Sequence, residues 1–210
     1  MADPPVARAP GRTSTEPRLA PSGPGRRLPG EQGIWVFVLL DMSFFGLLFV
    51  AYTVQQVHSP ELFAQAQRTL DTRLGLLNTT ILLTSSWLAA LAVHAARRDH
   101  VRAASRRLSM AAACGVAFGV SKGVEYAGKI GAGYSVLTDD FFLFYFVITF
   151  IHLLHVLAGT LVLLLMKRSL TSQAQGSGAL KRLESATTYW HMVDLLWVMI
   201  FALLYLARWT

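Results

Sequence analysis

Five long apolar segments, separated by polar connections, follow one another along the chain after residue 30. They cover residues 34–54, 78–96, 108–127, 141–166 and 188–207. Each is close to the roughly 20 residues that a helix needs to cross about 30 Å of hydrocarbon. The pattern predicts an all-α integral membrane bundle of five transmembrane helices and disfavours a soluble protein with five buried helices.

Two of the polar connections predict further structural features. In the first, apolar residues from Leu62 to Leu77 recur close to helical spacing, which predicts a short helix lying in the membrane interface. The fourth contains Ser172, Gly176, Ser177 and Gly178, and this composition predicts a flexible loop.

The first thirty residues differ from the rest of the chain. They hold seven of its eight prolines and five arginines, with no long apolar run. Such a segment buries too little apolar surface to offset its ordering entropy. We therefore predict a disordered basic tail over 1–30, or alternatively a basic anchor for anionic lipid, followed by a membrane domain over 31–210.

Composition and charge support the membrane class. Hydrophobic residues make up 53% of the chain and charged residues 15%. The net charge of +7 could suggest a nucleic-acid partner, but the basic residues lie in the connections, fourteen on one side of the predicted membrane and four on the other. The positive-inside rule therefore predicts a cytoplasmic N-terminus and an outer C-terminus, with no nucleic-acid partner. The single cysteine, Cys114, excludes a disulfide framework and a cysteine metal site.

Three acidic residues lie within the predicted spans. Asp41 and Asp194 are deep, and Glu125 is in the last turn of the third span. A carboxylate at the centre of a membrane helix costs about 2.5–3.5 kcal/mol on insertion scales, so each acid is a functional candidate. Lys122, three residues before Glu125, is expected to pair with it and to extend its ammonium group towards the interface.

Three histidines also fall in the spans, and they allow two interpretations. His152 and His155 share one helix face, and His191 shares a face with Asp194 in the fifth span. Histidines from facing helices could bind a haem or a metal. They could equally hydrogen-bond the membrane acids and hold the helices together.

Several short strings of polar and aromatic residues recur along the chain in a defined order. They are Phe37-Val-Leu-Leu-Asp41-Met-Ser-Phe44-Phe45, Leu77-Asn78-Thr79, Glu125-Tyr126, His152-Leu-Leu-His155-Val-Leu-Ala-Gly159 and Tyr189-Trp190-His191-Met-Val-Asp194-Leu-Leu-Trp197. The last string is the most specific, and together the strings cover about residues 33–207. In this order and spacing they resemble the subunit III family of cytochrome c and quinol oxidases.

The resemblance implies a non-catalytic accessory subunit of a haem-copper respiratory oxidase in a bacterial inner membrane. Such a subunit packs on catalytic subunit I, alongside other oxidase or reductase subunits, binds phospholipid and supports proton-coupled turnover in aerobic electron transport. Haem and copper are then expected in the partner, with no catalytic residue, metal or cofactor in this chain. The implied lipid- and proton-related residues are Asp41, Glu125, His152, His155, His191 and Asp194, and the implied packing motif is Asn78, Gly159, Trp190 and Trp197.

The sequence departs from the family pattern at two informative positions. The membrane acid is usually glutamate and here is Asp41, which is one methylene shorter. A glycine usual before the first histidine of the fourth span is replaced by Phe150, which is expected to alter helix approach.

Two other functions are compatible with these residues. One is a free-standing membrane cytochrome or quinone-binding protein that uses His152, His155 and His191. The other is an accessory protein of nitric oxide reductase.

Overall fold

A computed structural model describes residues 32–172 and 177–207 of the chain. The tail predicted over 1–30 lies outside these residues. The elements in chain order are α1 Gln32–His58, α2 Pro60–Gln67, α3 Thr72–Ala96, α4 Val101–Gly131, α5 Asp140–Thr171, α6 Ser177–Phe201 and a π-helical turn, η1, Ala202–Leu206.

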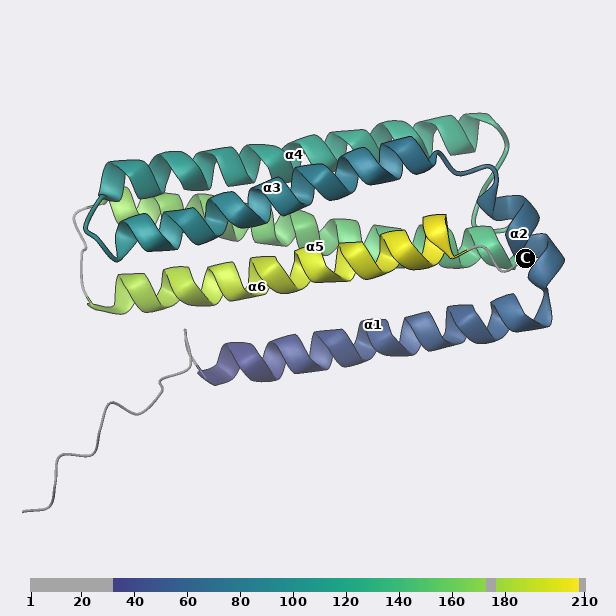
Figure 1. Cartoon of the computed structure of the whole chain (residues 1–210), viewed down its shortest axis with the longest axis horizontal. Coiled ribbons are helices and arrows are strands. Elements are labelled where there is room, and N and C mark those ends of the chain that lie inside the picture. The colour runs from purple at the N-terminus through teal and green to yellow at the C-terminus, as the bar shows by residue number, and fades with distance from the viewer. Residues whose placement is uncertain (1–31, 173–176, 208–210) are drawn as a thin grey trace, which may run out of the picture.

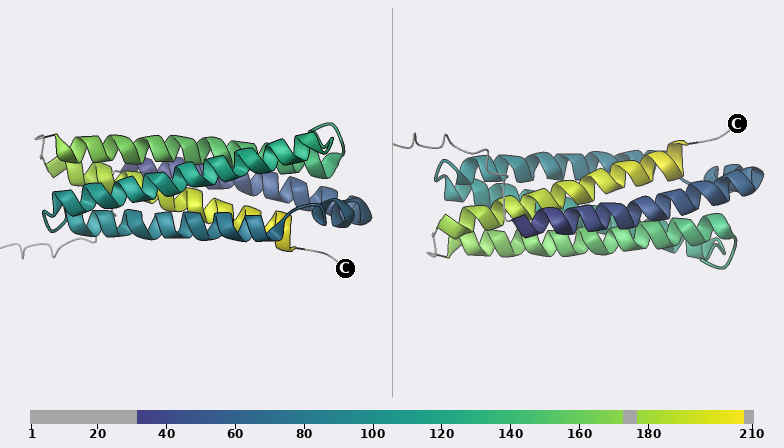
Figure 2. Two further views of the ribbon diagram at one scale, coloured as in Figure 1. Left: turned by 90° about the horizontal axis from the view of Figure 1, so that it is seen from above. Right: turned by 90° about the horizontal axis from the view of Figure 1, so that it is seen from below.

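Helices α3, α4, α5 and α6 form a four-helix bundle, and α1 lies outside it (Figure 1). Each bundle helix packs against two neighbours, in the order α3–α4–α5–α6 and back to α3. Helix α1 runs over the seam between α5 and α6, as the right view in Figure 2 shows. Most of its apolar side chains remain exposed, as expected of a helix surrounded by lipid.

Four helices, α1, α3, α5 and α6, are both long and apolar enough to cross a membrane. Helix α4 has 31 residues and is less apolar, but it lies alongside α3 and α5 through the bundle (Figure 2). Its charged residues Lys122 and Glu125 point inwards and are buried. The predicted bundle of five long helices is therefore confirmed.

The helices extend beyond the predicted spans. Asp71 and Asp139 cap the first turns of α3 and α5 by accepting hydrogen bonds from backbone N–H groups. The flexible loop predicted for the fourth connection is wrong for Ser177 and Gly178, which belong to α6, and α5 continues to Thr171. Residues 173–176 of this connection lie outside the described residues. The first turns of α6 carry charged residues that break the apolar run, yet Leu183 is buried against the bundle and supports the helix.

The short helix predicted in the first connection exists as α2, at the same end of the bundle as η1 (Figure 1). It is shorter than the pattern from Leu62 to Leu77 indicated, because Leu74 and Leu77 belong to α3. Gln67 of α2 is buried and donates hydrogen bonds to the Tyr52 hydroxyl and to the Ala207 carbonyl oxygen. Helix α2 therefore closes this end of the bundle and satisfies a carbonyl that follows the π-helical turn.

Trp190 of α6 is fully buried and contacts residues of α3, α4 and α5. Its indole N–H donates to Ser85 Oγ at 3.1 Å, and Ser85 donates in turn to the Ala111 carbonyl oxygen at 2.8 Å. The indole ring lies against two glycines: a Cβ atom would come within 2.6 Å of it at Gly159 and 3.0 Å at Gly115. Small residues at these two positions let the helices approach closely enough to enclose the ring.

We predict that Gly159→Ala destabilises the protein by about 1–3 kcal/mol, because the added methyl group overlaps the Trp190 ring. The matched control is Gly123→Ala on α4, where a Cβ atom meets nothing within 4 Å. That change should leave stability equal or slightly higher, since alanine is the better helix former. Thermal inactivation in detergent distinguishes the two, and equal melting temperatures for both variants would contradict this account of the packing.

Candidate functional site

The most extensive polar cluster surrounds the ammonium group of Lys122, near the end of the bundle closed by α2. Lys122 Nζ lies 2.9 Å from Glu125 Oε2, and the Glu125 Oε1 atom accepts hydrogen bonds from the hydroxyls of Tyr145 at 2.7 Å and Tyr205 at 2.6 Å. The ammonium also faces the rings of Tyr126, Tyr145 and Trp197 at 4.9–5.5 Å. Cation–π contacts of this kind stabilise a desolvated ammonium group.

The predicted ion pair between Lys122 and Glu125 is confirmed, but the predicted direction of Lys122 is wrong. Its side chain is fully buried and does not extend to the interface. Inside the bundle the Lys122 ammonium group contacts three tyrosine rings and a carboxylate, which replace the water that would solvate it outside. A fully partnered charge can remain buried, so the lysine has no need to reach water.

The second polar cluster joins α1 to α5. Asp41 Oδ1 lies 3.2 Å from His155 Nε2, and His155 Nδ1 lies 2.8 Å from the Ile151 carbonyl oxygen. A carbonyl oxygen only accepts, so Nδ1 carries a hydrogen. The Nε2 atom of the same ring is turned to the Asp41 carboxyl group, and this polar contact joins α1 to α5.

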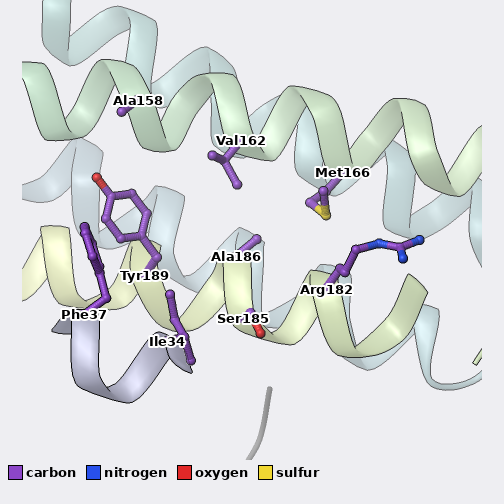
Figure 3. A pocket seen from close by; sticks show the side chains of 9 residues that line it. All are labelled: Ile34, Phe37, Ala158, Val162, Met166, Arg182, Ser185, Ala186 and Tyr189. Atoms are coloured by element: carbon purple, nitrogen blue, oxygen red, sulfur yellow. The ribbon is translucent and has the colours of Figure 1, made fainter. Parts of the chain in front are cut away.

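A groove of about 420 Å³ begins beside this pair and runs along α5 and α6 (Figure 3). Phe37 of α1 and Tyr189 of α6 form one end, and their rings are 5.8 Å apart. The Tyr189 hydroxyl donates to the His155 carbonyl oxygen at 3.3 Å. Ala158, Val162 and Met166 line the middle, and Arg182 lies at the other end. The groove is thus apolar along its length and positively charged at one end.

The third polar cluster lies between α3 and α6. The Ser86 hydroxyl is hydrogen-bonded to His191 Nδ1, and Asp194 lies one helical turn after His191 on the same face of α6. Asp194 is buried, and neither of its oxygens has a hydrogen bond of ordinary geometry within the described residues. A cavity of about 230 Å³ opens beside His191, and an ion pair of Arg97 with Glu184 lies on its wall.

The three histidines do not face a common centre. His155 is turned to α1 and His191 to α3, whereas His152 is fully buried and stacks on Trp197 with ring centroids 5.3 Å apart. Both ring nitrogens of His152 lack a hydrogen-bond partner among the described residues, as do both side-chain polar atoms of Asn78. Nowhere in residues 32–172 and 177–207 do three histidine, cysteine or acidic side chains come together as a metal site would require.

Trp197, the remaining residue of the predicted packing motif, donates its indole N–H to Thr79 Oγ1 at 3.0 Å and lies edge-on against Phe118. The sequence did not identify Tyr145 and Tyr205, the two tyrosines whose hydroxyls complete the Lys122 cluster. A usable signal was present for Tyr145, which lies seven residues before His152 and therefore on the same helix face. Tyr205 follows a π-helical turn, which the sequence did not indicate.

These features define a class of protein: a multi-pass helical membrane bundle in which charged and aromatic side chains are paired inside the protein. The model of the family "Cytochrome c oxidase subunit III" matches residues 30–210 of this chain. The chain therefore belongs to the cytochrome c oxidase subunit III family and is a subunit III of a haem-copper oxidase of the respiratory chain.

Individual relatives agree with this assignment. The chain is 30% identical over 182 residues to "Cytochrome c oxidase subunit 3" of Corynebacterium diphtheriae, which covers 84% of this chain and 87% of that protein. It is 26% identical over 174 residues to "Cytochrome bo(3) ubiquinol oxidase subunit 3" of Pseudomonas aeruginosa, covering 83% of each chain. It is 27% identical over 183 residues to "Heme-copper oxidase subunit I+III" of Aeropyrum pernix, covering 84% of this chain and 22% of that protein. The predicted subunit III family is confirmed, and the alternative of a free-standing membrane cytochrome is not supported.

We predict that Glu125→Gln destabilises the bundle by about 3–5 kcal/mol, because it leaves the Lys122 ammonium buried without a counter-charge. Adding Lys122→Met should recover part of that loss. The control is Glu184→Gln, which breaks the more exposed pair with Arg97 and should cost about 0–1 kcal/mol. Thermal unfolding of the three variants in one detergent tests the prediction, and a double variant less stable than Glu125→Gln alone would contradict it.

Proposed function

We propose that this chain is a non-catalytic subunit that packs on the catalytic subunit of a bacterial haem-copper oxidase, binds phospholipid and supports proton-coupled turnover. The observation that carries the proposal is the position of the Asp41–His155 pair beside the groove. The relative from Aeropyrum pernix adds support for the partner, because its name places subunits I and III in one chain.

The groove has the chemistry of a phospholipid site. Its apolar middle suits an acyl chain, and the Arg182 guanidinium suits a phosphate, with which it can form two parallel hydrogen bonds. Arg182 and Tyr189 are seven residues apart on α6, so the groove extends about 10 Å along the helix. A lipid bound there would bring its chain to Phe37 and Tyr189, next to the Asp41–His155 pair.

Asp41 and His155 suit a supporting role rather than a chemical step. The pair is mostly buried, and it holds α1 against α5. A phospholipid in the groove would shield it from the surrounding membrane. Loss of the pair would then loosen α1 and the lipid while leaving the haems of the partner in place.

We predict that Asp41→Asn leaves the first turnovers of the assembled oxidase unchanged and shortens the time over which activity persists. The change keeps the side-chain shape and removes the ionisable group that pairs with His155. The control is Glu61→Gln, which removes an exposed carboxyl on α2. Oxygen consumption followed over many turnovers in membranes measures both phases. Loss of the first turnovers in a fully assembled complex would assign Asp41 to the chemistry and contradict the accessory role.

We predict that Val162→Trp displaces the phospholipid that the wild-type chain retains, because the indole fills the middle of the groove. Arg182→Gln should weaken retention by about tenfold or more, since a charge-assisted hydrogen bond contributes about 1.5–3 kcal/mol. Leu161→Trp is the matched control, because Leu161 is exposed on the same helix and does not line the groove. Native mass spectrometry counts the bound lipids, and equal retention by Val162→Trp and Leu161→Trp would rule out this groove.

We further propose that the connection between α3 and α4 faces the cytoplasm and α2 the outside, as the distribution of basic residues predicts. The test is labelling of single cysteines, Gln65→Cys and His100→Cys, in a Cys114→Ala background. An impermeant maleimide applied to intact cells should react at position 65 and not at 100, and permeabilised cells should react at both. The reverse pattern on intact cells would mean the opposite orientation.

A further inference from the structure

A polar cavity opens between α3 and α6, towards the end of the bundle opposite α2. It is lined by His94 and Arg97 of α3 and by Glu184, Thr188 and His191 of α6. Arg97 Nη2 lies 2.8 Å from Glu184 Oε1, and the Arg97 side chain is about half exposed, so this end reaches water. Asp194 is ten residues from Glu184 on α6, about 15 Å further into the membrane.

Asp194 is a buried carboxyl group for which the described chain supplies no cation. Its side chain is 3% exposed, and its two oxygens lack hydrogen bonds of ordinary geometry. The charged and titratable groups on the surrounding helices are engaged elsewhere: Arg97 with Glu184, Lys122 with Glu125, His155 with Asp41, and His152 with the Trp197 ring. An unpaired carboxylate at this depth is costly, and a proton neutralises it without any rearrangement of the bundle.

Two polar side chains lie near this carboxyl group. His191 is one helical turn before Asp194 on the same face of α6, and its Nδ1 atom is hydrogen-bonded to the Ser86 hydroxyl of α3. His191 itself is exposed on the cavity wall. An imidazole and a hydroxyl, which can both donate and accept a hydrogen bond, therefore join the cavity to the neighbourhood of Asp194.

We propose that Asp194 is a proton-binding site that exchanges protons with the α3–α6 cavity through His191 and Ser86. A proton from water in the cavity binds His191 Nε2. The Nδ1 hydrogen then passes to Ser86 Oγ while the Ser86 hydroxyl hydrogen passes to the Asp194 carboxylate. One proton has entered, Asp194 is neutral, Ser86 is again a hydroxyl, and His191 is a neutral imidazole with its hydrogen on Nε2. Reversal of the same steps releases the proton.

This inference deepens the proposed part in proton-coupled turnover and rests on that role for its biological use. The exchange itself is independent of catalysis and can be measured on the resting protein. If the chain purified with no oxidase partner, the proposed function would fail while the exchange could still be observed.

The test is infrared spectroscopy of the full chain, purified in mild detergent with the subunits that accompany it and transferred to D₂O. The C=O stretching band of a protonated carboxyl group shifts when its hydrogen is replaced by deuterium. The carboxyl band that is absent from the Asp194→Asn variant belongs to Asp194. If that variant does not accumulate, the band that is displaced in Asp194→Glu makes the same assignment. We expect Ser86→Ala and His191→Phe to slow the shift of this band by about tenfold or more, a factor that corresponds to roughly 1.4 kcal/mol of barrier.

The matched control is Thr84→Ala. Thr84 is on the same helix, exposed, and bonded only to the Thr80 carbonyl oxygen of its own helix. In the Thr84→Ala variant the Asp194 band should shift at the wild-type rate. The proposal is overturned if neither Asp194 variant changes a carboxyl band, if Ser86→Ala and His191→Phe exchange as fast as wild type, or if Thr84→Ala slows exchange equally.

Discussion

The structure depends on one constraint: hydrocarbon offers no hydrogen bonds, so a polar group inside a membrane helix must find its partner within the protein. The clearest instance is Lys122, whose ammonium group is enclosed by Glu125, Tyr145 and Tyr205. These partners come from α4, from α5 and from the π-helical turn that follows α6. The cluster therefore fixes which face of α4 points inwards, and it ties the C-terminal turn to the centre of the bundle. Without it, α4 would be the least favourable of the five helices to place in lipid.

The same constraint explains why α1 remains attached. Its outer face is almost wholly aliphatic and exposed. Its contacts with the bundle lie along a narrow strip, where Phe37, Asp41, Phe45 and Tyr52 recur at about helical spacing. The Asp41–His155 pair is the polar contact at the centre of this strip, and Gln55 adds a hydrogen bond to Asp140 near its end. A helix held by so narrow a strip leaves room for the groove beside it.

Helices α1, α3, α5 and α6 could be predicted because each contains an apolar run long enough to cross a membrane. Helix α4 is less apolar, and its place in the bundle depends on the burial of Lys122 and Glu125. Helix ends were less predictable, since the first turns of α6 are polar in sequence and are held by tertiary contacts of Leu183 and Glu184. The direction of Lys122 could not be predicted, because its burial depends on tyrosines 20 or more residues away in the chain.

The two departures from the family pattern have small structural effects. Asp41 is one methylene shorter than glutamate, yet α1 lies close enough to α5 for it to reach His155. Phe150, which replaces a glycine and was expected to alter helix approach, points outwards with about half its surface exposed. Neither effect could be deduced from the sequence, because both depend on how the two helices are rotated about their axes.

The central claim is that this chain contributes no haem of its own and acts as part of a haem-copper oxidase. The most direct test is purification of the tagged chain in mild detergent, followed by a visible absorption spectrum and identification of the co-purifying subunits. The account predicts haem absorbance that accompanies a large catalytic subunit and stays with that subunit when a harsher detergent separates the two. Haem remaining on the separated chain, and lost on changing His152, His155 or His191 to alanine, would contradict it.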